Sequence, residues 1–303
     1  MFRRILKWIG IVLGVLVVLL AALYGFIYFR SEAIMNQVYT VPPIAITLPT
    51  DAATVERGAH LMSAITDCKA CHGDNLGGGI VFEDSMLGRI VAPNLTTGQN
   101  GLGSQLSNED IAHVLRYGVL PSGLSVRVMP AEEFTHLTEA DMLAVMAYLR
   151  SVPPVDSNLP ATRLLPMGRA LLVAGVLDIM IAKRIDFSHV GSDPVPAGVT
   201  PEYGHYLANV AGCTSCHGPG LSGGAIQGAP PSFPHSANLT SSGEVGTWTE
   251  AQFVQTLRTG VNPAGHELLD PMPWRVFKNM TDDELGAVWA FIKSMPAKPA
   301  GTH

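Results

Sequence analysis

The hydrophobic and polar positions divide the chain into one continuous apolar run and two later regions of helical periodicity. The run extends from Trp8 to Phe29 without a charged residue. As a helix it would be about 33 Å long at roughly 1.5 Å per residue, which is enough to cross the hydrocarbon layer of a membrane. The pattern predicts a transmembrane anchor over residues 1–30 and a linker over residues 31–50.

The charges around this run predict its orientation. Arg3, Arg4 and Lys7 precede the run, and only Arg30 follows it closely. The positive-inside rule then places the N-terminus in the cytoplasm and the remaining chain on the periplasmic or extracytoplasmic side of a bacterial cytoplasmic membrane. The alternative is a cleaved secretory signal, whose apolar region is usually shorter, roughly 7 to 15 residues. We expect an uncleaved, single-pass anchor.

Each of the two periodic regions reads as a set of helices. In the first region, apolar residues at helical spacing predict helices from Thr54 into Cys68, from Ser107 to Gly118, and from Thr138 to just before Pro153. Ser107 with Asp110 resembles a capping box, and so do Thr249 with Gln252 and Thr281 with Glu284 in the second region. Because no convincing alternating run predicts a strand, the expected fold class is all-α.

The two regions are copies of one domain. "MP" followed by "FTHLTEADMLAVMAYLRSVP" aligns without a gap with "MP" followed by "FKNMTDDELGAVWAFIKSMP", and "CHGDNLGGG", "NLTTG" and "LRYGV" recur as "CHGPGLSGG", "NLTSSG" and "LRTGV". We assign domain 1 to residues 51–154 and domain 2 to residues 193–303. The interdomain linker, residues 155–192, holds an apolar segment from Ala170 to Ala182 that is too short to span a membrane. We expect a helix buried between the two domains; the alternative is a helix on the membrane surface or on a membrane-embedded partner.

All four cysteines of the chain lie in two C-x-x-C-H strings, which are Cys68, Cys71 and His72, and Cys213, Cys216 and His217. This is the attachment signature of c-type haem, because each thiol can form a thioether with a vinyl group while the histidine reaches the iron. A redox disulfide or one zinc site shared by both pairs is the alternative. The expected cofactors are two covalently attached haem c groups.

The duplication also selects the second iron ligand, which must occupy matched positions if both haems are bound alike. Met129 and Met272 match, and each precedes a proline that favours an extended loop. Met142, Met146, His113 and His136 have no ligand at the matched position, and the two methionines read as core residues. His60 and His205 match, but each precedes its own motif on the same helix, so a haem-edge or helix-surface contact is the better interpretation.

These motifs together resemble class I cytochrome c domains, and more narrowly the membrane-anchored cytochrome c subunits of bacterial alcohol, aldehyde and sugar dehydrogenases. The resemblance covers Thr54 to Pro296 and implies all-α haem domains, proximal ligands His72 and His217, and distal ligands Met129 and Met272. Those subunits commonly carry three haem motifs, whereas this chain has two, so attachment to a dehydrogenase stays open.

Two further matched pairs are candidates for haem binding. Arg116 and Arg258 occupy one helical position and either neutralise a propionate or are solvated helix charges. Asn94 and Asn238 either bind propionates or shape the turn.

Charge narrows the range of partners. Residues 51–160 carry 13 acidic and 6 basic side chains, and residues 191–303 carry 9 and 5, giving −7 and −4. This charge disfavours nucleic acid and favours a basic or mixed-charge redox protein. We predict a non-enzymatic electron carrier between a membrane or periplasmic donor, either a dehydrogenase or a quinol-oxidising complex, and an acceptor such as a terminal oxidase. The alternative is a dihaem peroxidase, which needs an open iron site.

Overall fold

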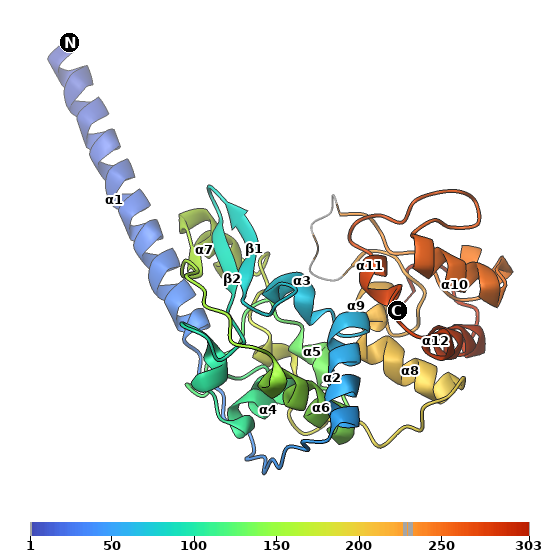
Figure 1. The fold of residues 1–303 in the computed structure, drawn as a ribbon. Helices are drawn as coiled ribbons and strands as arrows, with labels where there is room; N and C mark the ends of the chain where they lie inside the picture. Colours follow the sequence, from blue (N-terminus) through green and yellow to red (C-terminus); the bar gives the residue numbers. More distant parts are fainter. Residues whose placement is uncertain (1, 227–228, 230–232, 303) are drawn as a thin grey trace.

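One long helix, α1 (Phe2–Met35), projects from the rest of the chain (Figure 1). The computed structural model describes residues 2–226, 229 and 233–302. Most side chains of α1 are apolar and exposed, and the helix is long and apolar enough to cross a membrane, as the sequence predicts. It continues past the predicted end of the anchor at residue 30 and buries Ser31 and Met35 against domain 1.

Both domains are built mainly from short helices in the same order. Domain 1 contains α2 (Ala52–Ala64), α3 (Cys68–His72), the 3₁₀ turn η1 (Leu102–Ser104), α4 (Asn108–Tyr117), α5 (Ala131–Phe134) and α6 (Glu139–Ser151). Domain 2 contains α8 (Pro201–Val210), α9 (Cys213–His217), η3 (Glu244–Thr247), α10 (Glu250–Thr259), α11 (Trp274–Phe277) and α12 (Asp282–Ser294). The predicted first helix ends at Ala64, three residues before the Asp67 that precedes the cysteine motif.

The predicted helix ends are confirmed where the sequence carried capping signals. Ser107 and Asp110 form a reciprocal capping box at the start of α4, as Thr281 and Glu284 do at the start of α12. Gly118 ends α4 in the left-handed conformation, with φ of 62°. Such side chains satisfy backbone N–H groups that have no partner inside the helix, so local sequence is sufficient to set these boundaries.

The first and last helices of each domain cross at a glycine. A Cβ atom on Gly58 of α2 would lie 1.9 Å from the carbonyl oxygen of Ala144 in α6, and one on Gly204 of α8 would lie 1.9 Å from that of Ala287 in α12. Only glycine permits the two backbones to approach so closely. The crossing fixes which residue of one domain is equivalent to which residue of the other.

In the register set by these crossings, His60 and His205 are not equivalent residues. The crossing glycines are 146 residues apart, whereas the first cysteines of the two motifs are 145 apart. By the helix register, His60 is therefore equivalent to Tyr206, not to His205. His60 lies at the domain interface, whereas the His205 ring packs 4.9 Å from that of Phe291, centroid to centroid, which agrees with a helix-surface contact for His205.

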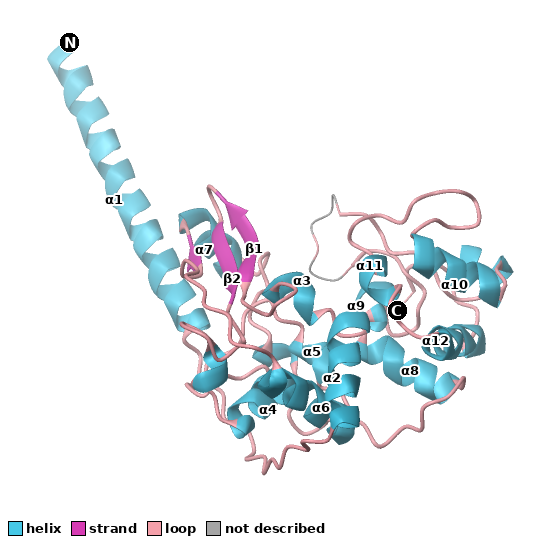
Figure 2. Ribbon diagram, viewed as in Figure 1, coloured by secondary structure: helices cyan, strands magenta, loops and turns pink. Residues whose placement is uncertain are grey.

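A small sheet corrects the all-α expectation (Figure 2). Strands β1 (Gly79–Asp84), β2 (Gly88–Ala92) and β3 (Arg163–Leu164) pair antiparallel in that order, with a register irregularity between Ile80 and Phe82. Where the corresponding segment of domain 2 is described, an isolated antiparallel bridge joins Gly224 and Ser236. The sequence pattern missed the β1–β2 hairpin because four consecutive residues of β1 are exposed, so apolar and polar positions do not alternate.

The interdomain linker does not form a helix buried between the two domains, contrary to the expectation from the sequence. Its helix α7 (Pro166–Val173) stops before Gly175, and a 3₁₀ turn η2 (Ala182–Arg184) follows. α7 packs against α1, and Leu172, Ile179 and Met180 share a buried cluster with Met35. The linker therefore fastens α1 to domain 1.

An ionic network at α2 and α8 joins the two domains. Arg57 donates to Asp141 through Nε at 3.0 Å and to Glu284 through a terminal nitrogen at 3.0 Å, and His60 Nε2 lies 2.7 Å from Glu284. Tyr206 donates to Asp141 at 2.6 Å. Burial alone would raise the pKa of Glu284, but the bonds from His60, Thr281 and Arg57 outweigh it and lower the pKa to about 2.

Candidate functional site

The two C-x-x-C-H strings fold identically, each as a helix of a single turn. α3 follows Asp67 and α9 follows Gly212, and both of these residues adopt positive φ, 49° and 72°. One helical turn places cysteines three residues apart on the same face. The four cysteines form no disulfide in the described residues.

Burial opposes ionisation of the motif thiols. Burial raises the pKa of Cys68 to about 11 and that of Cys213 to about 12. Reactive C-x-x-C pairs have a lowered thiol pKa instead, because their surroundings stabilise the thiolate. No group of three or more histidine, cysteine or acidic side chains that could hold a metal ion occurs in the described part of the chain.

Each motif histidine is oriented by a backbone carbonyl. Nδ1 of His72 lies 2.8 Å from the carbonyl oxygen of Pro93, and Nδ1 of His217 lies 2.7 Å from that of Ala237. A carbonyl can only accept, so Nδ1 carries the proton and Nε2 keeps its free electron pair. Burial lowers the pKa of both rings, which favours the neutral form. Both imidazoles are thus prepared to bind a metal through Nε2.

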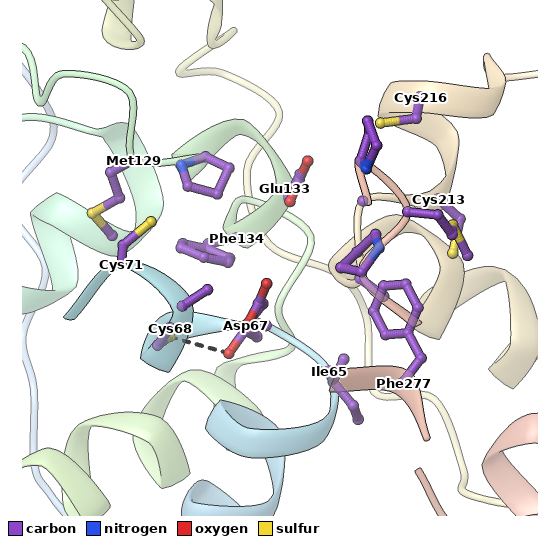
Figure 3. Close-up of a pocket in the computed structure, with 18 of the residues that line it drawn as sticks. Ile65, Asp67, Cys68, Cys71, Met129, Glu133, Phe134, Cys213, Cys216 and Phe277 are labelled. Carbon is purple, nitrogen blue, oxygen red and sulfur yellow. Dashed lines mark hydrogen bonds between the residues drawn. The ribbon is translucent and has the colours of Figure 1, made fainter. Parts of the chain in front are cut away.

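Both motifs open into one cavity of about 1000 Å³ that extends across the boundary of the two domains. Its walls are mainly apolar, with Leu95, Leu115 and Phe134 in domain 1 and Leu239 and Phe277 in domain 2. Figure 3 shows the two cysteine pairs on opposite sides of this space. Its size lies at the upper end for ligand cavities, roughly 300 to 1,000 Å³, and its apolar walls fit flat hydrophobic groups such as porphyrins.

The matched methionines lie on loops that line this cavity. In both copies the second residue after the methionine donates to its carbonyl, with Ala131 to Met129 at 2.7 Å and Trp274 to Met272 at 2.8 Å. Met142 and Met146 are 2% and 0% exposed and belong to the core cluster, as the sequence predicted.

The four residues predicted as propionate partners are hydrogen-bonded to backbone carbonyls. None of them lines the cavity in the described residues, and each is bound to the protein itself; they are Asn94, Asn238, Arg116 and Arg258. Asn94 donates to the carbonyl of Val155 at 2.6 Å, and Asn238 donates to that of Lys298 at 2.8 Å. These bonds fasten each turn to the segment that follows the last helix, so the turn-shaping alternative describes both residues.

The matched arginines also have structural partners. Arg116 donates to the carbonyls of Thr135 and Leu137, and Arg258 donates to those of Lys278 and Met280. Both therefore hold the connection between the methionine loop and the last helix. Arg116 is buried, and burial lowers its pKa.

Sequence matching missed the charged residues that do line the cavity, because most of them have no like-charged counterpart in the other copy. The domain 2 side has Glu244, Glu267 and the exposed His235, and the domain 1 side has Asp67, Arg127, Glu133 and Arg150. Arg150 is the exception, since it matches Lys293 in the alignment of the last helices. Among the described residues, the domain 1 side therefore combines two arginines with two carboxyl groups, whereas the domain 2 side carries two carboxylates without an arginine or lysine.

A carboxylate from domain 1 reaches the motif of domain 2. The carboxyl group of Glu133, on α5, lies so close to Gly212 that a Cβ there would be 2.5 Å from Oε1 (Figure 3). Burial raises the pKa of Glu133 to about 7, with Glu132 and Asp67 adding repulsion and Ser215 opposing the shift. Sequence reasoning gave no sign of this group, because its neighbours come from the other domain.

Comparisons with known proteins agree with the duplication. The family model for cytochrome c matches residues 55–153 and again residues 202–296. The chain is 30% identical over 288 residues to the cytochrome c subunit of alcohol dehydrogenase (quinone) from Gluconobacter oxydans (strain 621H), covering 84% of this chain and 57% of that protein. It is 28% identical over 286 residues to the gluconate 2-dehydrogenase cytochrome c subunit from Pantoea cypripedii, covering 82% and 61%.

The chain is also similar, over a shorter stretch, to the cytochrome subunit of a third dehydrogenase. The fructose dehydrogenase cytochrome subunit from Gluconobacter japonicus is 32% identical over 134 residues, covering 41% of this chain and 28% of that protein. The chain spans less than two thirds of the length of these relatives.

Proposed function

The chain belongs to the cytochrome c family, and we propose that it is a membrane-tethered dihaem cytochrome that transfers single electrons. The observation that carries this proposal is the repetition of one complete ligand arrangement. In each copy a one-turn C-x-x-C-H helix and a Met-Pro loop face the same cavity. A cytochrome subunit of this kind performs no catalysis of its own.

The residues present fit two covalently attached haem c groups. Cys68 and Cys71 would bind one haem and Cys213 and Cys216 the other, and each iron, when bound, would cycle between the ferrous and ferric states. His72 and His217 would supply the proximal nitrogen, because a carbonyl already holds each Nδ1 proton.

Met129 and Met272 would supply the distal sulfur. Thioether ligation favours the ferrous state relative to two histidines and so raises the reduction potential. If Met129 and Met272 both bound iron, neither haem would be open to peroxide, so the matched positions of the two loops at the cavity favour an electron carrier over a dihaem peroxidase.

The proposed partners are redox proteins. The relatives named above are cytochrome subunits of dehydrogenases, so a dehydrogenase is a donor of matching type, and a quinol-oxidising complex is the other donor class. A terminal oxidase would be the acceptor. With α1 in the bacterial cytoplasmic membrane and both haem domains on its periplasmic side, tethering limits the search for these partners to the membrane surface.

Optical and electron paramagnetic spectra of the purified protein test the assignment. Both haems should be low-spin when ferric, with a near-infrared sulfur-to-iron charge-transfer band. Met129→Ala should remove the band of one haem and Met272→Ala that of the other, whereas Met146→Leu, in the core, should leave both bands. A high-spin haem that turns over hydrogen peroxide in the unmodified protein would contradict the proposal.

A further inference from the structure

Exposed apolar side chains outside α1 are concentrated on the β1–β2 hairpin of domain 1 and on the linker helix α7. Of the ten large exposed hydrophobic residues described outside α1, five lie on the hairpin or on α7 and the turn after it and do not line the cavity; they are Ile80, Phe82, Met86, Met167 and Val176. Met86 at the hairpin tip is 63% exposed and Val176 is 60% exposed. A concentration of exposed apolar side chains is typical of an interaction site.

Direct contacts connect this surface to α1. The hairpin tip is joined to α7, because Leu165 donates to the carbonyl of Leu87 at 3.0 Å and the backbone of Gly168 packs against the same oxygen. α7 is joined to α1 by Arg169, which pairs with Glu32 at 2.7 Å and donates to Ser31 at 2.8 Å. The hairpin is therefore held in a fixed position relative to the membrane-spanning segment.

The level of the hairpin and α7 along α1 indicates which layer of the membrane they contact. The guanidinium of Arg169 also lies over the ring of Tyr28, 4.7 Å from its centroid, and Tyr28 is at the end of the uncharged run. Tyrosine and arginine at the end of an apolar helix are typical of the headgroup layer. In Figure 1 the hairpin and α7 rise beside α1, on its side of domain 1 and toward its N-terminal half.

We propose that the β1–β2 hairpin and α7 form a second membrane contact, with the apolar tip immersed in the outer interfacial layer of the bilayer that α1 spans. The polar groups of the hairpin agree with this depth. Asp84 accepts from the backbone of Met86 and Leu87 at 2.8 and 2.9 Å, and Glu83 pairs with Arg89. Paired charges are tolerated among headgroups but are costly in hydrocarbon.

An arginine next to the tip supplies a partner for lipid phosphate. Arg163 of β3 is directly opposite Arg89 of β2 in the sheet. Arg89 pairs with Glu83 at 3.4 Å, so the guanidinium of Arg163 is the one that would attract an anionic headgroup. The contact would add a second point at which domain 1 meets the membrane and so fix its orientation there. This inference rests on the membrane tether of the proposed function.

Spin labelling of the full-length, haem-loaded protein in nanodiscs of phosphatidylcholine and phosphatidylglycerol tests the contact. Since haem attachment would consume the four native thiols, an introduced cysteine is the one available for labelling. A label at Met86→Cys should collide with dissolved oxygen several-fold more often, relative to a water-soluble nickel complex, than a label at Val199→Cys. Val199 is a matched control because it is apolar and 53% exposed, in domain 2.

A label at Val18→Cys, in the middle of α1, separates this inference from the tether itself. If Val18 is in lipid while Met86 has the accessibility of Val199, the tether stands and the hairpin contact is wrong. If Val18 is also in water, both are wrong. Met167→Cys on α7, which is 50% exposed, gives a second site where Met86→Cys fails to fold. Shielding of Met86 from both reagents would indicate a protein partner and overturn the lipid assignment.

Discussion

Domains 1 and 2 share the contacts that build a haem crevice and differ in the charges that surround it. Both cross their first and last helices at a glycine, hold the motif histidine by a carbonyl, and use a matched arginine to secure the methionine loop. Around the cavity, domain 1 supplies both arginines and carboxyl groups, whereas the charged lining residues described in domain 2, apart from His235, are the carboxylates Glu244 and Glu267. The contrast indicates one scaffold with two electrostatic environments.

The domain interface also combines a shared scaffold with side chains that differ between the two copies. By the register of the helix crossings, Arg57 and His60 of α2 are equivalent to Tyr203 and Tyr206 of α8. The basic pair and the tyrosine pair meet around two matched carboxylates, Asp141 and Glu284. Two copies of one fold thus pack through equivalent surfaces whose side chains have become complementary.

The largest expected effect on stability comes from adding a methyl group where two helices cross. Gly58→Ala should destabilise domain 1 by about 3 kcal/mol or more, because the added methyl group meets a backbone oxygen that cannot move aside. Gly204→Ala should do the same to domain 2. Denaturant unfolding measures both. Gly286→Ala is the control, because its nearest neighbours, at 3.2 Å, are side-chain atoms of Glu250 and Val199; equal losses in all three variants would contradict the crossing argument.

Breaking the interface network should have the next largest effect. Arg57→Met leaves the carboxylates of Asp141 and Glu284 without their shared cation, and we expect a loss of roughly 1 to 3 kcal/mol, reduced by the partial exposure of Arg57. Calorimetry should show the two domains unfolding more independently. Arg275→Met, whose pair with Asp270 is highly exposed, should change stability by less than about 1 kcal/mol. Similar effects of both substitutions would be evidence against a role for the network.

A pH dependence should distinguish domain 1 from domain 2. The raised pKa of Glu133, about 7, means that the folded protein binds more protons than the unfolded chain between the ordinary glutamate pKa and that value. The stability it contributes is full at low pH and is lost as pH rises toward and through 7. Glu133→Gln should flatten this slope, measured as the thermal midpoint at about pH 5 and about pH 8.

The matched residue in domain 2 supplies the control for Glu133. Val276 occupies the equivalent position, four residues after its methionine, and cannot titrate. Val276→Ala should therefore leave the pH slope unchanged. An unchanged slope in Glu133→Gln would show that other groups cause it.

The smallest expected effect is on the two reduction potentials. Positive charge stabilises the ferrous state, so the haem of domain 1 should have the higher potential. Arg127→Gln should lower it and Glu267→Gln should raise that of domain 2, each by roughly 20 to 70 mV for a charge about 10 Å away. Potentiometric titration resolves the two haems. Shifts of the same sign in both variants would refute the electrostatic contrast.

The sequence by itself determined the repeated parts of this protein. Local signals such as the capping boxes at Ser107 and Thr281 set the helix ends, and the duplicated motif predicted the haem pairs. The apolar run of α1 also predicted its helix, because an apolar composition over some twenty residues is sufficient to predict a spanning helix.

Only the tertiary structure decided which side chains face the cavity and which face the other domain. Asn94 and Arg116 have counterparts at matched positions of domain 2, as the predicted iron ligands do. Their hydrogen-bond partners, however, are backbone carbonyls distant in sequence. The single-residue offset between the helix crossings and the cysteines, and the contact of Glu133 with the other domain, also lie outside any local pattern. The physical reason is that a repeated residue records a shared backbone requirement, whereas burial and charge depend on neighbours that folding brings together.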